Sequence, residues 1–284
     1  MSQLPSDFDL DAYVTAVLAE DLGTGGDVTS ANTIAEGARF SAVMDAREEI
    51  AVAGMTVAEA FFRRLDHGVE IEALVEDGDV VPAGTDLMRL TGKARAMLSA
   101  ERSALNTLQV LCGIATQARA FAQVVEGTGA TVLDTRKTIP GLRALSKYAS
   151  RMGGAANHRM RMDDGLLIKD NHIAVNGGDI ALTVARAKAG SHGLQVQVEV
   201  DRIDQIEPAL GAGADRLLLD NMPPDVLREA VALVAGRVPL EASGGISLET
   251  IRAVAETGVD YISTSKITMG APAVDIGLDY AICG

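Results

Sequence analysis

The sequence predicts an α/β protein in which a small sheet-rich domain, residues 1–110, precedes an α/β barrel, residues 111–270. Three observations support this prediction. The 284 residues suffice for a barrel and a smaller domain. Short alternating runs fill residues 39–97, as in antiparallel sheets. From residue 131 onward, apolar runs alternate with segments long enough for helices, which is typical of parallel α/β folds.

The first domain begins with a helix predicted at residues 8–20, where apolar positions recur three and four apart. The stretch "DLGTGGDVTS" (21–30) has the composition of a glycine-rich turn, and it lacks the spacing of a dinucleotide-binding loop. Alternating runs follow, the last of them "ARAML" (94–98), and a helix at residues 55–65 interrupts them. These patterns indicate a small sheet with at least one helix.

A long helix is predicted at residues 99–126, and strands and helices alternate after it. The expected strands are residues 131–136, 165–170, 196–201, 216–221, 238–245 and 260–265. Such an order fits a TIM-like barrel, complete or incomplete, or an open doubly wound sheet. No strand is followed by a dinucleotide fingerprint, so the barrel is favoured. The alternating character of residues 271–284 would let this segment return to the first domain.

Composition excludes several classes of function. A formal net charge of −14 argues against nucleic acid as a partner, because binding to a phosphate backbone needs a basic surface. No run of about 20 apolar residues is present, so no membrane span is expected. The start of the chain is acidic and lacks an apolar signal region, and two cysteines give neither a disulfide framework nor a metal-binding spacing. The sequence therefore indicates a cytoplasmic protein.

Positive charge is concentrated in one segment of this acidic chain. Between Arg136 and Lys169 there are eight cations and two anions, a local charge of +6. Arg143, Lys147 and Arg151 have the i, i+4, i+8 spacing of a solvent-exposed helix face. A helix face does not explain Arg136 and Lys137, because they end an apolar run. A local anion-binding site is the alternative interpretation.

Polar side chains follow the predicted strands where each strand ends. The groups are Thr135, Arg136 and Lys137; Lys169, Asp170, Asn171 and His172; Glu199; Asp220 and Asn221; Ser243, Gly244 and Gly245; and Ser263, Thr264, Ser265 and Lys266. In a barrel, the carboxyl ends of the strands share one face, where such enzymes build their active sites. We therefore expect these groups to meet at one opening.

The chemistry of these groups suggests what would bind there. Guanidinium groups such as those of Arg136 and Arg159 pair with carboxylate or phosphate. Glu199 and Asp220 could hold Mg²⁺, steady a developing positive charge, or only balance the cations. Gly244 and Gly245, before a helix expected near Ser247, would expose amides to a phosphate. Together these features indicate a phosphorylated, pyrophosphate-bearing substrate that meets a polycarboxylate.

Several stretches, in their order and spacing, resemble the quinolinate phosphoribosyltransferase family, also called nicotinate-nucleotide pyrophosphorylase (carboxylating). They are "EDLGTGGDVTS", "ERSALNTLQVLCGIAT", "LDTRKTIPGLRALSKYASRMGGAANHRM", "DGLLIKDNHI", "LLLDN", "EASGGI" and "GVDYIS". The resemblance covers residues 20–279. It implies a sandwich-like N-terminal domain, an incomplete barrel and a homodimer. The implied reaction, part of NAD biosynthesis, transfers phosphoribose from phosphoribosyl pyrophosphate to quinolinate and yields nicotinate mononucleotide, pyrophosphate and CO₂.

The resemblance also implies roles for individual residues. The carboxylates of quinolinate would meet Arg136, His158, Arg159 and Lys169, with Thr135 beside them, and Arg102 would reach the site of a partner subunit. Lys137 and Lys169 would face the pyrophosphate, and Glu199 and Asp220 would lie near the ribose and Mg²⁺. Ser243, Gly244 and Gly245 would bind the 5′-phosphate, with Ser265 nearby. Of these, Lys137, Lys169, Glu199 and Asp220 are the expected catalytic residues.

One stretch departs from the family pattern, and two other interpretations stay open. After "DYIS" this chain reads "TSKITMG" where the family usually has a glycine near Ser265, so the contacts of this loop and of Lys266 are open. A paralogue associated with molybdate transport shares the fold and the "RKT" block, but it lacks an intact "LIKDNH" stretch. A non-catalytic barrel that binds a phosphorylated metabolite would not need Arg102, Arg136, Arg159 and Lys169 together.

Overall fold

The computed structural model describes residues 4–280, and its contacts divide the chain into two compact units. The N-terminal unit comprises the residues up to 117, residues 144–153 and the residues from 271 onward. The C-terminal unit comprises residues 118–143 and 154–270. Residues 144–153, which the sequence assigned to the second domain, thus group with the first unit. Among the described residues, no helix is both long enough and apolar enough to cross a membrane.

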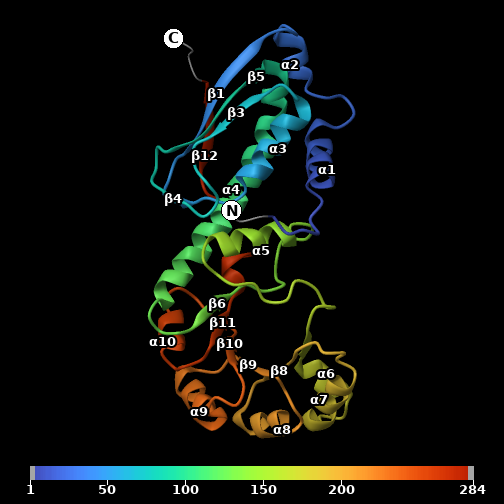
Figure 1. The fold of residues 1–284 in the computed structure, drawn as a ribbon, viewed down its shortest axis with the longest axis vertical. Coiled ribbons are helices and arrows are strands. Elements are labelled where there is room, and N and C mark those ends of the chain that lie inside the picture. The colour runs from blue at the N-terminus through green and yellow to red at the C-terminus, as the bar shows by residue number, and fades with distance from the viewer. Residues whose placement is uncertain (1–3, 281–284) are drawn as a thin grey trace. The chain divides into compact units, whose positions relative to one another are not determined.

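The N-terminal unit is an antiparallel sheet with helices (Figure 1). Its elements are α1 (Leu10–Leu22), α2 (Val28–Thr33), β1 (Arg39–Ala46), β2 (Ile50–Ala51), α3 (Met55–Leu65), β3 (Glu70–Ala73), β4 (Val80–Val81), β5 (Asp86–Lys93), α4 (Ala94–Val125), which ends in the other unit, α5 (Arg143–Met152) and β12 (Ile276–Tyr280). Within residues 4–280, the main sheet has the strand order β12-β1-β5-β3, and β2 pairs with β4. The C-terminal strand β12 therefore lies beside β1 in this unit.

Side-chain caps begin several helices of this unit. Asp9 caps α1 by accepting a hydrogen bond from the backbone N–H of Ala12. Asp27 caps α2 in the same way. At α3, the carboxylate of Asp77 accepts the backbone N–H groups of Gly54 and Met55, each at 3.0 Å. Asp77 thus satisfies donors that the first helical turn would leave without a partner.

The C-terminal unit is built on a parallel sheet. Its elements are β6 (Thr131–Leu133), β7 (Leu166–Ile168), α6 (Asp170–Val175), α7 (Ile180–Ala189), β8 (Val196–Val200), η1 (Ile203–Gln205), α8 (Ile206–Gly211), β9 (Arg216–Asp220), α9 (Pro224–Val234), β10 (Leu240–Ser243), α10 (Ile251–Ala255), β11 (Tyr261–Ser263) and η2 (Ser265–Ile267). Within the described residues, the strand order is β6-β11-β10-β9-β8-β7. Strands that follow one another in the chain are neighbours in the sheet, as in an α/β barrel. However, β6 and β7 lie at the two edges of the sheet and do not pair with each other, so the barrel is incomplete.

Alternation along the strands gives this sheet two different faces. Residues on one face pack with the helices into a hydrophobic core; the strand residues of this core are Val132, Ile168, Val196, Val198, Val200, Leu217, Leu219, Leu240, Ala242 and Ile262. Val184 of α7 and Leu227 of α9 belong to the same core. In Figure 1, α7, α8 and α9 lie along this side of the sheet. Because successive side chains in a strand point to opposite faces, the intervening residues point to the other face.

The structure confirms the α/β fold class and the positions of the predicted strands. Each predicted strand of the second domain is present but shorter, because its polar end leaves the sheet; residues 216–221, for example, become Arg216–Asp220. Two local predictions are wrong. The run "ARAML" (94–98) opens α4 instead of forming a strand, and the end of "DLGTGGDVTS" forms α2. The five residues of "ARAML" are too few to distinguish the period of a strand from that of a helix. In the glycine-rich stretch, Asp27 caps a short helix that the composition did not indicate.

We expect Leu219→Ala to lower the free energy of unfolding by about 2–5 kcal/mol, because it removes a fully buried side chain between β9 and the helices. Leu182→Ala on α7, where the side chain is 41% exposed, serves as the matched control and should cost much less. Urea denaturation of the two variants and the parent measures both changes. Equal losses would contradict the assignment of the two faces.

Candidate active site

A cavity of about 330 Å³ opens at the carboxyl ends of the parallel strands. Its lining comes from the loop after β6, from the segment before β7, and from β7 to β11. The lining residues are Thr135, Arg136, Lys137, His158, Arg159, Leu167, Lys169, Glu199, Leu218, Asp220, Glu241, Ser243 and Ser263. Residues from widely separated parts of the chain therefore share one pocket, as the positions of the strand ends predicted.

The pocket lining carries several cations. Arg136 and Arg159 both line it, and the Nε of Arg136 is buried without a hydrogen-bond partner among the described residues. Nη1 of Arg159 donates to the carbonyl of Gly165 at 2.7 Å. Burial and the nearby charge of Arg136 lower the pKa of Arg159. Two guanidinium groups that repel each other in a partly buried pocket form a site that an anion would stabilise.

Lys137 is placed by its backbone. Its N–H donates to the hydroxyl of Thr135 at 3.0 Å, and its carbonyl accepts the hydroxyl of Thr268 at 2.8 Å. The loop after β6 is therefore held on both sides of Lys137, while the side chain remains exposed at the pocket.

The pocket lining also includes acidic side chains. Glu199 at the end of β8 forms an ion pair with the half-exposed ammonium of Lys169, which follows β7. Asp220 ends β9, and the side-chain amide of Asn221 donates to its carboxylate at 2.6 Å. Because β8 and β9 are neighbours in the sheet, the carboxylates of Glu199 and Asp220 come from adjacent strand ends. The pocket thus presents two carboxylates from adjacent strand ends, one of them paired with Lys169, in addition to the guanidinium groups of Arg136 and Arg159.

The pocket is also lined by the hydroxyl groups of Ser243 and Ser263. The Oγ atoms of Ser243 and Ser263, which pair across β10 and β11, lie 3.0 Å apart. Gly244 follows with φ of 92°, and a Cβ atom there would lie 2.2 Å from Oδ1 of Asn221. Only glycine fits this close approach. The expected helix does not start near Ser247: α10 begins at Ile251 and is short.

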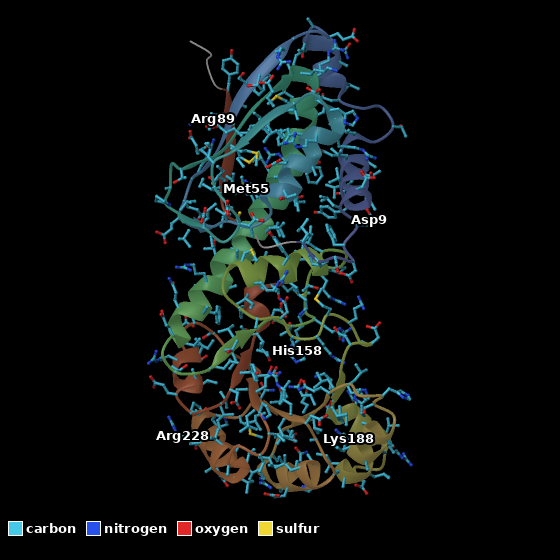
Figure 2. The ribbon with its side chains drawn as sticks, viewed as in Figure 1. Asp9, Met55, Arg89, His158, Lys188 and Arg228 are labelled. Carbon is cyan, nitrogen blue, oxygen red and sulfur yellow. The ribbon has the colours of Figure 1, made fainter. Side chains whose placement is uncertain are left out.

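The segment before β7 is tied to a buried carboxylate. Asp134, which is completely buried, accepts the backbone N–H of His158 at 2.9 Å and the side-chain amide of Asn157 at 2.5 Å. His158, labelled in Figure 2, lines the pocket, and its Nε2 is 3.1 Å from Oε1 of Gln197. Asp134 therefore fixes the backbone from which Arg159 also extends.

Glu241 and Gln197 are site residues that the sequence reasoning missed. Glu241 is fully buried yet lines the pocket, and its Oε2 lies 2.7 Å from Nη2 of Arg216. Burial raises the pKa of Glu241, but the hydrogen bond with His158 and the charge of Arg216 outweigh it, so the pKa is lowered and the group is ionised. A signal was present: Glu241 interrupts an apolar run two residues before Ser243, on the same face of the strand.

Several predicted residues do not line this pocket. Gly244, Gly245 and Ser265 lie just beyond the ends of β10 and β11, next to lining residues. Lys266, in η2, is exposed and is not among the lining residues. Arg102 belongs to α4 in the N-terminal unit. For these residues the predicted roles stay predictions.

The donor set for a metal ion is partial. Among the described residues, no group of three or more His, Cys, Asp or Glu side chains could hold a metal. Glu199 and Asp220 supply carboxylate oxygens from adjacent strands and leave other ligand positions to water and substrate. That donor set suits Mg²⁺, which is usually held by one or two carboxylates together with substrate phosphates.

Comparison with known proteins agrees with this geometry. The family model for the N-terminal domain of quinolinate phosphoribosyl transferase matches residues 27–124, and the model for its C-terminal domain matches residues 114–279. The chain is 40% identical over 283 residues to the nicotinate-nucleotide pyrophosphorylase (carboxylating) of Mycobacterium leprae, covering 96% of this chain and 99% of that protein.

A second relative and a solved structure lead to the same family. The probable nicotinate-nucleotide pyrophosphorylase (carboxylating) of Bacillus subtilis is 39% identical over 263 residues, covering 93% of this chain and 90% of that protein. The nicotinate-nucleotide pyrophosphorylase structure from Francisella tularensis superimposes with a TM-score of 0.91 at 38% identity, covering 99% of this chain and 98% of that one. The chain therefore belongs to the quinolinate phosphoribosyl transferase family.

Proposed function

We propose that the protein transfers phosphoribose from phosphoribosyl pyrophosphate to the ring nitrogen of quinolinate and releases nicotinate mononucleotide, pyrophosphate and CO₂, a reaction of NAD biosynthesis. The observation that carries this proposal is the pocket itself. One cavity is lined both by two guanidinium groups, those of Arg136 and Arg159, and by two carboxylates from adjacent strand ends, those of Glu199 and Asp220. Such an arrangement suits a substrate pair in which one member is a dicarboxylate and the other develops positive charge.

Quinolinate would bind at the cationic part of the lining. Its two carboxylates would take the guanidinium groups of Arg136 and Arg159, whose mutual repulsion favours an anion between them. Lys169, already paired with Glu199, would contact either a carboxylate or the pyrophosphate. These anchors would align the ring nitrogen with C1 of the ribose, and alignment of this kind lowers the barrier strongly.

The acidic side chains would act at the reacting carbon. As the bond from C1 to the pyrophosphate oxygen breaks, the ribose gains oxocarbenium character, which the carboxylates of Glu199 and Asp220 would stabilise. Lys137 and Lys169 would stabilise the negative charge on the departing pyrophosphate. Mg²⁺, held by Glu199 and Asp220 directly or through water, would neutralise further phosphate charge when bound.

Neither the phosphoribosyl transfer nor the decarboxylation requires a protein side chain to act as a base. The lone pair of the ring nitrogen forms the new bond to C1, and the electrons of the broken bond leave with pyrophosphate. The bond from C2 to its carboxylate carbon then breaks, CO₂ departs, and the electron pair remains at C2 beside the quaternary nitrogen. A proton from solvent completes the product. The protein's task is therefore to bind, align and balance charge.

The 5′-phosphate of the ribose would lie at the ends of β10 and β11. The hydroxyls of Ser243 and Ser263 already meet there, and the backbone at Gly244 and Gly245 has positive φ. Glycine at both positions leaves backbone amides unshielded for phosphate oxygens. Ser265 follows within the same loops and would add a hydroxyl.

We further propose a cytoplasmic homodimer in which Arg102 of each subunit reaches the other subunit's pocket. The stretch "ERSALN", which contains Arg102 and resembles the family segment whose arginine reaches the partner's site, supports this role. Cys112 is a free, buried thiol, which suits a reducing compartment. The net charge of −14 argues against a nucleic-acid partner.

An assay with quinolinate, phosphoribosyl pyrophosphate and Mg²⁺ tests the proposed reaction. We expect CO₂ and nicotinate mononucleotide to form in equal amounts, and chelation of Mg²⁺ to abolish turnover until the ion is restored. Binding without product would support a non-catalytic phosphometabolite sensor instead. Product from nicotinic acid in place of quinolinate would indicate a different phosphoribosyltransferase.

Arg136→Ala should raise the KM for quinolinate about 30-fold, because losing a charge-assisted contact costs about 2 kcal/mol. The KM for phosphoribosyl pyrophosphate should change much less. Arg228→Ala, which truncates an exposed arginine on α9, is the control (Figure 2). Steady-state kinetics with each substrate varied in turn measure the effect, and equal weakening of both substrates would contradict the assignment of Arg136.

Mixing inactive Arg102→Ala and Lys169→Ala proteins should restore activity if Arg102 acts across a dimer interface. A hybrid dimer then contains one pocket with both native residues. When equal amounts of the two proteins pair at random, about half of the dimers are hybrids and each has one intact pocket of two, so activity should reach about a quarter of the parent's. Mass spectrometry of the intact assembly confirms hybrid formation. Hybrids without activity would place Arg102 outside the partner's site.

A further inference from the structure

A buried polar network lies beneath the candidate site, on the pocket side of the sheet. In the strand register Gln197 pairs with Arg216, and Glu241 pairs with Leu218 and with Tyr261. The guanidinium of Arg216 stacks on the ring of Tyr261, with its Cζ 3.9 Å from the ring centroid. An ionised carboxylate under an anion-binding pocket would be costly without such compensation. Arg216 supplies the compensation for Glu241.

The contacts of this network determine which way each polar group faces. Oε2 of Glu241 accepts the side-chain amide of Gln197 at 2.8 Å, so the carbonyl Oε1 of Gln197 must face the other way. That Oε1 lies 3.1 Å from Nε2 of His158. A carbonyl oxygen can only accept, and therefore Nε2 of His158 must carry the hydrogen. The carboxylate of Glu241, 3.5 Å from the same Nε2, favours this arrangement.

The second ring nitrogen of His158 contacts the backbone of the next residue. Its Nδ1 accepts the backbone N–H of Arg159 at 2.8 Å, which is compatible with a ring that carries its hydrogen on Nε2 alone. Both ring nitrogens are thus engaged within the protein. The predicted role of His158 as a direct ligand of quinolinate stays a prediction, and these contacts indicate a second role for its ring.

We propose that Glu241 is a positioning residue that acts through Gln197 to fix the orientation and tautomer of His158, and through it the backbone of Arg159. The sequence of contacts runs from a buried carboxylate to an amide, to an imidazole and finally to the N–H of the residue whose guanidinium lines the pocket. The effect on quinolinate rests on the proposed function, whereas the state of the His158 ring does not.

Gln197→Leu is the most direct test, because leucine has a similar size and leaves the Glu241–Arg216 pair in place. Gln123→Leu, an exposed glutamine on α4, is the matched control. Protein labelled with ¹⁵N-histidine reports the ring state through long-range correlations of the ring nitrogens. The chain has four histidines, and the spectrum of His158→Gln identifies the signals of His158.

The parent and the Gln123→Leu control should show His158 as one neutral species with its hydrogen on Nε2. In Gln197→Leu, this signal should become a mixture of tautomers, and the KM for quinolinate should rise about tenfold. The kcat and the KM for phosphoribosyl pyrophosphate should change less than about twofold. Glu241→Gln, which removes the acceptor-only carboxylate that orients the Gln197 amide, should perturb the same signal.

Two results would overturn the proposal. One is a parent spectrum in which His158 carries its hydrogen on Nδ1 or on both nitrogens. The other is a Gln197→Leu protein that loses thermal stability while the ring state and the KM for quinolinate stay unchanged, since this would show a purely structural role. Absence of quinolinate turnover in the parent would refute the proposed function alone, because the ring spectra decide the positioning role independently.

Discussion

The two-residue period of the parallel strands determines both the core and the pocket of this protein. In β8, for example, Val196, Val198 and Val200 pack into the hydrophobic core, while Gln197 and Glu199 point to the other face. β9 and β10 repeat the pattern in register. A shift of one residue in any strand would move its charged side chains into the core and its valines or leucines into the pocket. Fold stability and site geometry are therefore specified by the same pattern.

The distribution of charge within the pocket follows from this arrangement. The cations come from the loop after β6, the segment before β7 and the end of β7, whereas Glu199 and Asp220 come from the middle strands. Lys169 and Glu199 come from the ends of the neighbouring strands β7 and β8 and form an ion pair, whereas Arg136 comes from the loop after β6, at the other edge of the sheet. In a chain with a net charge of −14, this local group of cations is the part of the pocket that would attract small anions.

Much of the fold could be predicted from the sequence, because the strands end in polar groups that an apolar core excludes. The site was harder to complete. Arg136, Lys169 and Asp220 were recognisable at strand ends, but Glu241 lies inside an apolar run, and its ionisation depends on Arg216 from a neighbouring strand. A contact between side chains on different strands depends on the tertiary structure, and a local sequence pattern does not reveal it. The run at residues 94–98 was misassigned for a related reason, since five residues fit both a strand and the start of α4.

A crystal structure of the protein with quinolinate bound would test the assignment of this pocket. We expect one carboxylate of the diacid within hydrogen-bond distance of Arg136, the other within hydrogen-bond distance of Arg159, and the ring nitrogen facing Glu199 and Asp220. Quinolinate bound outside this cavity, or with its nitrogen facing the guanidinium groups, would refute the assignment.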